Sequence, residues 1–177
     1  VSKAYTEGYY YKPRIDYELL DQHHDGLIAL SGCLGGELAQ HLAPDGSVEE
    51  GNTSNERSFE KALEVAKKYQ SIFGKNNYFI EIHNHGIKQQ LDILDDLVEI
   101  AEIIEAPLVA ANDSHYVEEN GAEAHDALLC VQTNRTLDDE SRFRFDGSGY
   151  YVKSSEEMRK LFPQDKYPNA CDNTCLL

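Results

Sequence analysis

Side chains that bind metal ions recur at three points of this sequence, each at or just past the end of a short apolar run. In chain order they are Cys33, Glu81, His83, Asp113 and His115. Imidazole and thiolate donors suit Zn²⁺, while carboxylates also accept Mn²⁺ or Mg²⁺. Residues two apart in an extended segment share a face, so each of the two pairs that end in histidine can point at one ion. The chemistry that these residue types predict is metal binding.

Each of these signals has a simpler interpretation when it is taken alone. A single Asp-x-His pair arises often by chance, and Cys33 by itself has the properties of a small buried hydrophobic residue. His85 either faces the same region or caps a turn, and His125 follows the pattern of a core histidine on the apolar side of a helix. The shared position at three successive strand ends favours metal ligands, because loops converge at the carboxyl ends of parallel strands.

The elements that must position these residues alternate between short strands and amphipathic helices. Buried strands are expected at 26–31, 78–83 and 107–112, and helices at 35–41, 55–73, 91–104 and 118–130. Connections of this length imply βαβ crossovers, so the fold class is α/β with a mostly parallel sheet. We expect a surface loop at 44–55, a brief strand at 150–153 and a helix that starts at Ser154.

The composition limits which classes of protein fit. The chain has 177 residues, 41% of them hydrophobic, and 16 Lys and Arg against 32 Asp and Glu give a net charge of −16. That charge argues against this segment binding the phosphate backbone of a nucleic acid by itself. The four cysteines form no Cys-x-x-Cys element, so neither a disulfide framework nor a structural zinc site is indicated, and a reducing cytoplasm fits best. They are Cys33, Cys130, Cys171 and Cys175.

The two ends of the sequence predict a segment of a longer protein. The chain begins at Val1 without an initiator methionine and ends at Leu177 in a helical pattern. No stretch approaches the roughly 20 apolar residues of a membrane span, and the first residues lack the apolar core of a signal peptide.

Several segments, in fixed order, resemble the bacterial replicative DNA polymerase III alpha subunits. The segment Tyr9-Tyr10-Tyr11-Lys12-Pro13-Arg14-Ile15-Asp16 is similar to the family's GFYYKPRID segment. The other matching segments are 26–38, 79–86, 111–116, 124–133 and 136–158. The matching region of the family is its polymerase-and-histidinol-phosphatase (PHP) domain. The resemblance implies that residues 1–134 are the C-terminal half of a PHP domain and that 135–177 bridge toward the polymerase palm.

The resemblance also implies a site. It predicts part of a distorted, TIM-like β/α barrel of PHP type with a metal cluster at its mouth. Cys33 matches the family's cysteine ligand, and Asp113 and His115 match its closing Asp-x-His pair. His83 stands where the family commonly has glutamine, so a ligand role for it rests on strand geometry alone. Glu81 and His85 fall in a family motif but are not carried over as ligands.

The implied function of the full-length protein is template-directed DNA synthesis in chromosomal replication. Its carboxylates for Mg²⁺ would lie beyond Leu177, and its partners would be template-primer, deoxynucleotides, a sliding clamp and an exonuclease subunit. This segment would hold Zn²⁺ or Mn²⁺ for 3′–5′ proofreading hydrolysis in the parent. Two alternatives stay open: a scaffold that braces the polymerase or docks an exonuclease subunit, and a stand-alone PHP phosphoesterase.

Overall fold

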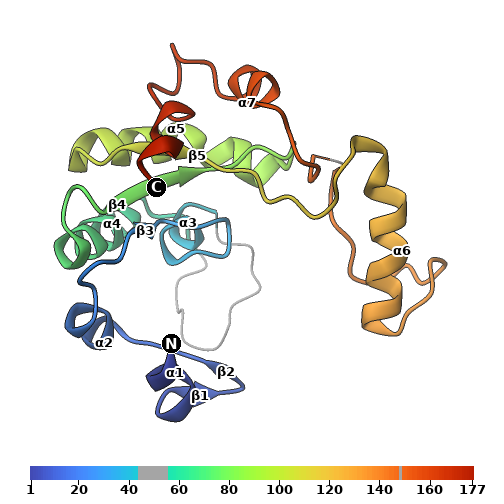
Figure 1. Cartoon of the computed structure of the whole chain (residues 1–177), viewed down its shortest axis with the longest axis horizontal. Coiled ribbons are helices and arrows are strands. Elements are labelled where there is room, and N and C mark those ends of the chain that lie inside the picture. The colour runs from blue at the N-terminus through green and yellow to red at the C-terminus, as the bar shows by residue number, and fades with distance from the viewer. Residues whose placement is uncertain (44–55, 148) are drawn as a thin grey trace.

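Three short parallel strands form the central layer of the chain, whose described residues in this computed structural model are 1–43, 56–147 and 149–177 (Figure 1). The strands are β3 (Ala29–Leu30), β4 (Tyr78–Ile82) and β5 (Leu108–Ala110), in the order β3-β4-β5. Both pairings are parallel, with Leu30 opposite Phe79 and Glu81 opposite Val109. The prediction of an α/β fold with a parallel sheet is confirmed, and the sheet is open among the described residues.

Two long amphipathic helices connect the strands. Helix α4 (Phe59–Phe73) lies between β3 and β4 in the chain, and α5 (Lys88–Ile104) lies between β4 and β5. The Ser58 hydroxyl caps α4 by accepting a hydrogen bond from a backbone N–H in its first turn. Gly74 ends α4 at a φ of +84°, a conformation that costs glycine little. Both predicted helices are therefore confirmed.

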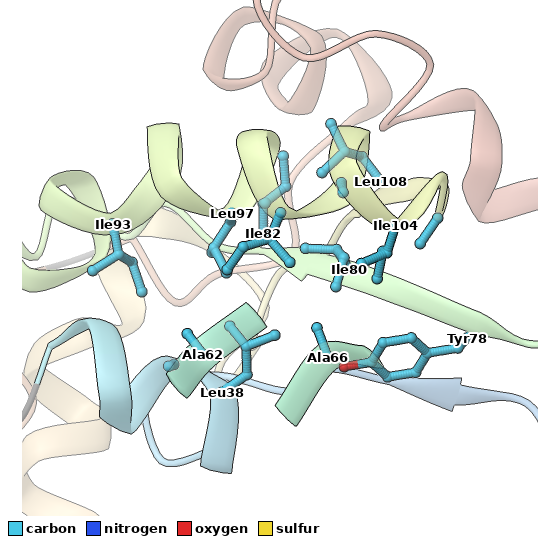
Figure 2. Close-up of a cluster of buried hydrophobic side chains, with 14 of the residues drawn as sticks. Leu38, Ala62, Ala66, Tyr78, Ile80, Ile82, Ile93, Leu97, Ile104 and Leu108 are labelled. Carbon is cyan, nitrogen blue, oxygen red and sulfur yellow. The ribbon is translucent and has the colours of Figure 1, made fainter. Parts of the chain in front are cut away.

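The hydrophobic core lies between these helices and one face of the sheet (Figure 2). Alternate residues of β4, namely Tyr78, Ile80 and Ile82, are at most 1% exposed and pack against the helices. Side chains alternate along a strand, so Phe79 and Glu81 point to the opposite face. One face of the sheet is thus assigned to packing, and the other carries the polar residue that leads to the candidate site.

Shorter elements flank this layer on both sides in the sequence. Before it come α1 (Ser2–Thr6), the antiparallel pair β1 (Tyr9–Tyr10) and β2 (Lys12–Pro13), and α2 (Tyr17–Gln22), and α3 (Glu37–Leu42) follows β3. After it come η1 (Glu119–Gly121), α6 (Ala122–Thr133), α7 (Ser155–Leu161) and η2 (Asp172–Leu176). Figure 1 shows α6 well to one side of the sheet, whereas η2 returns to it. No helix within the described ranges is long and apolar enough to cross a membrane.

The C-terminal segment covers the outer edge of β5. The backbone N–H of Ala110 donates to the carbonyl of Ala170 at 2.9 Å, and the Asn173 amide donates to the carbonyl of Leu108 at 2.7 Å. These bonds satisfy backbone groups of β5 on the side away from β4.

Four sequence predictions need correction or cannot be compared. The strand expected at 26–31 is not buried: Leu27 and Ile28 are about half exposed, because among the described residues β3 pairs with β4 alone. Residues 150–153 form a single parallel bridge between Tyr116 and Tyr151 rather than a strand. Leu128, predicted on the apolar side of its helix, is 61% exposed because α6 stands apart from the core. The loop predicted at 44–55 lies outside the described residues.

Candidate metal centre

Glu81 and His83 form a nearly buried pair at the carboxyl end of β4. Their side chains are 13% and 10% exposed, and the His83 Nε2 atom lies 2.9 Å from Glu81 Oε1. To donate to a carboxylate, the ring must carry a proton on Nε2. Nδ1 then presents a lone pair, and it is buried with no hydrogen-bond partner among the described residues. A histidine held by a carboxylate on one nitrogen and bare on the other has the arrangement of a metal ligand.

Cys33 sits beside this pair because a tight turn follows β3. The Gly36 N–H donates to the carbonyl of Cys33 at 2.8 Å, and a Cβ on Gly36 would lie 2.6 Å from the carbonyl oxygen of Ser31. The Ser31 hydroxyl in turn accepts a hydrogen bond from the backbone N–H of Glu81 at 2.9 Å. These contacts tie the end of β3 to the end of β4.

A small cavity lies between the two strand ends. Cys33, Glu81 and His83 all line it, and its volume is about 10 Å³. Such a volume is near the lower limit for one water molecule, and therefore for one small ion. Three residues with possible metal-donor side chains thus line one small cavity.

His85 connects the end of β4 to the end of β5. It is 5% exposed, and its ring stacks on Tyr150 with centroids 4.5 Å apart. The backbone N–H of Asp113 donates to His85 Nε2 at 3.2 Å, so the ring proton is on Nδ1, next to the amide oxygen of Gln90. Burial lowers the pKa of His85, and the neighbouring His83 lowers it further, which keeps this ring neutral.

Asp113 and His115 form the second polar pair, after β5. Asp113 Oδ1 lies 3.1 Å from His115 Nε2, and both side chains are more open to solvent than the Glu81–His83 pair. The two side chains of each pair lie side by side, and the prediction that each pair points at one ion stays a prediction. Asn112 anchors the segment that carries this pair, because its side-chain amide donates a hydrogen bond to the carbonyl of Tyr151 at 2.7 Å.

The residues predicted for the site therefore lie in two pairs with His85 between them, and Cys33 joins the first pair. Ring centroids of His83 and His85 are 5.7 Å apart. Across the described ranges, no three His, Cys, Asp or Glu side chains are grouped closely enough to hold an ion. The donor types suit a divalent metal, while convergence of Cys33 with Asp113 and His115 stays a prediction.

Sequence reasoning missed two residues that build this region. Gln90 is 7% exposed and accepts a hydrogen bond from the backbone N–H of His85 at 2.8 Å. Tyr150 covers His85, and burial raises the pKa of its hydroxyl, with Asp113 adding to the effect. A glutamine on the apolar side of a strongly amphipathic helix is a signal that could have identified the first. The second has no comparable signal in the sequence.

Comparison with known proteins first defines a class. Residues 1–85 match the PHP domain family. This match includes Cys33, Glu81, His83 and His85, the residues at the ends of β3 and β4.

The particular relatives are DNA polymerase III alpha subunits. The chain is 43% identical to the one from Saccharopolyspora erythraea over 176 residues, 99% of this chain and 14% of that protein. It is 44% identical to those from Treponema pallidum and Deinococcus radiodurans, over 98% of this chain and 14% and 12% of theirs. The chain corresponds in sequence to a stretch of these alpha subunits that includes PHP-domain sequence, so the resemblance read from its motifs is confirmed. It spans only about one seventh of these relatives.

Proposed function

We propose that this chain is part of the PHP domain of a replicative DNA-directed DNA polymerase. Similarity to DNA polymerase III alpha subunits along 98–99% of the chain supports the proposal. Residues 1–134 would form the C-terminal half of the domain, and 135–177 would lead toward the polymerase body. Both long helices pack on one face of a parallel sheet, as they do in a β/α barrel, so the complete domain would close such a barrel.

We further propose that the strand ends hold divalent metal for phosphodiester hydrolysis, in support of 3′–5′ proofreading. Two observations carry this proposal: His83 Nδ1 is buried with no hydrogen-bond partner among the described residues, and His83 lines a small cavity together with Cys33. Cys33, Asp113 and His115 would be ligands, with His83 as a fourth from this chain. The mixed donors fit Zn²⁺ or Mn²⁺, while Mg²⁺ would serve polymerisation elsewhere in the parent. A bound divalent metal would supply activation of water for attack on phosphorus.

The chain's other residues would set the geometry of these ligands. Glu81 fixes the proton of His83 on Nε2 and so keeps Nδ1 free. His85, whose pKa is lowered by burial, accepts a hydrogen bond from the backbone N–H of Asp113. This bond positions the backbone from which the Asp113 carboxylate extends. Partners of the parent would be template-primer, deoxynucleotides, the sliding clamp and an exonuclease subunit, in the bacterial cytoplasm.

The test uses the full-length protein with Asp113→Asn and with His115→Ala. Each variant is assayed for primer extension and for removal of a 3′ mismatch, with a melting curve on the same preparation. Loss of mismatch removal with normal extension supports the hydrolytic site, because extension would depend on carboxylates in another domain. Unchanged mismatch removal in both variants would contradict it.

A scaffold that braces the polymerase or docks an exonuclease subunit is the second candidate. It is favoured by the lack, within the described ranges, of any three ligand-type side chains close enough to hold one ion. Equal loss of extension and mismatch removal, together with a lowered melting temperature, would support the scaffold. A stand-alone phosphoesterase fits less well, because residues 135–177 are also covered by the similarity to the polymerase subunits.

A further inference from the structure

A second cavity, of about 240 Å³, lies between α6 and the segment that returns to the strand ends. Four aromatic rings line it together with charged and aliphatic side chains, and none of the metal-ligand candidates does. The rings that line it are those of Tyr116, His125, Phe145 and Tyr150. Polarisable aromatic rings therefore form part of its wall.

The aromatic wall is a connected cluster. Ring centroids of His125 and Phe145 are 5.0 Å apart, and those of Phe145 and Tyr150 are 4.8 Å apart. Tyr116 lies 5.5 Å from His125 by the same measure. Aromatic rings at these separations hold one another in place, so the cavity wall is set before a ligand arrives.

Charged side chains of both signs line the cavity. The Asp126 carboxylate is bound by both terminal nitrogens of Arg142, one of them at 2.6 Å. Arg144 and Glu123 also line the cavity and make no ion pair with each other. A ligand with an aromatic body, hydrogen-bonding edges and an attached anion would match this set.

The cavity also adjoins the proposed hydrolytic site. The His115 ring packs edge-on against the Phe145 ring, with centroids 4.6 Å apart. The centroids of the His115 and His125 rings are 5.3 Å apart. A ligand stacked in the cavity would therefore lie one aromatic layer away from the Asp113–His115 pair.

We propose that this cavity binds the base of the 3′-terminal nucleotide of a single DNA strand. The base stacks within the aromatic wall and Arg144 faces the phosphate. Stacking on aromatic side chains is the general way in which proteins hold unpaired bases, and it accepts any base because each has a π face. The substrate class rests on the proposed hydrolytic function, which supplies the reason for a strand end at this position.

The experiment maps where a strand end lies. A single-stranded oligonucleotide with 5-iodouracil at its 3′ end is crosslinked by light to the full-length protein in EDTA, which prevents hydrolysis. The adducts are located by mass spectrometry of peptides. We expect them on Tyr116, Phe145 or Tyr150, and adducts confined to peptides outside 116–150 would overturn the proposal.

Two variants test the stacking. Phe145→Leu keeps apolar volume but removes the π face and should lower the yield about tenfold. Phe143→Leu is the matched control, because Phe143 is 58% exposed and does not line the cavity, and its yield should be unchanged. Equal yields from the two variants would contradict the proposal. Adduct mapping in the unsubstituted protein decides it even if Phe145→Leu does not fold.

A third experiment distinguishes the two possible ligands, the 3′ end of a DNA strand and a free mononucleotide. Thymidine monophosphate is added at the concentration of the oligonucleotide, and we expect the adduct yield to persist. If the free nucleotide abolishes it, the ligand is a mononucleotide and the strand-end assignment is wrong. Adducts in the cavity without any mismatch removal would leave this subsite standing and contradict the hydrolytic function alone. Mismatch removal with adducts elsewhere would contradict the subsite alone.

Discussion

At the scale of residues, the two histidines that follow β4 have opposite tautomers and therefore opposite roles. His83 donates through Nε2 to Glu81, which leaves Nδ1 bare, whereas His85 accepts at Nε2 from the Asp113 backbone. Sequence alone predicted that His83 faces the site but left His85 between two interpretations. The tautomer of His85 depends on Gln90 and Asp113, which only the fold brings into contact with its ring.

Glu81→Gln tests the orienting role of this carboxylate. The amide oxygen can still accept from His83 Nε2, but the negative charge that strengthens the imidazole as a donor is lost. Loss of such an outer carboxylate typically lowers metal affinity about 10- to 100-fold. The measurement is competitive Zn²⁺ titration of the full-length protein. Glu99→Gln, an exposed change on α5, is the control and should leave the affinity as it was. Equal affinities for the two variants would contradict the role of Glu81.

At the scale of elements, the sequence predicts those parts of the fold whose apolar pattern is long enough to be periodic. Helices α4 and α5 were predicted because each buries one continuous stripe, and β4 and β5 because their runs are apolar and sit between them. Residues 150–153 have a strand-like composition but form a single bridge. Their partners are a polar loop and the first turn of α7, and neither offers a long strand to pair with.

Helix α7 shows how one residue joins two elements. Glu157 accepts from the Ser154 N–H at 2.8 Å within a capping box, and from the Tyr151 hydroxyl at 2.7 Å. These bonds lower the pKa of Glu157 to about 2 from 4.5. A carboxylate with a lowered pKa stabilises the folded state above its unfolded pKa, and that stability is lost as the pH falls from 4.5 toward 2. Glu157→Gln should therefore flatten the pH dependence of the unfolding midpoint in this range, whereas Glu156→Gln in the same turn should not. Identical pH profiles for the two variants would show that the capping box does not carry this dependence.

At the scale of the whole molecule, the two outer strands of the sheet differ, because β5 is covered and β3 is exposed. The C-terminal segment bonds to β5, while β3 leaves Leu27, Ile28 and Leu30 exposed by 39–50%. The sequence predicted these apolar residues as a buried strand. It could not show that β3 pairs with β4 alone within the described part of the chain, because strand pairing depends on the whole sheet.

Expressed as residues 1–177 alone, the chain should associate through this edge. Exposed apolar strand edges pair with other chains and bind hydrophobic dyes. We expect dye fluorescence well above that of the full-length protein, and Ile28→Lys should reduce it. A soluble monomer with a sharp cooperative melt and no dye binding would contradict this prediction.

The central claim is that the strand ends of this chain bind a divalent metal through Cys33 and His83 Nδ1. Co²⁺ titration of the metal-stripped full-length protein, followed by absorption spectroscopy, tests it most directly because a bound thiolate gives its own charge-transfer band. We expect this band to appear on titration, to disappear in Cys33→Ser and to weaken in His83→Leu, while Cys130→Ser leaves it intact. A spectrum that is the same in all four proteins would contradict the claim.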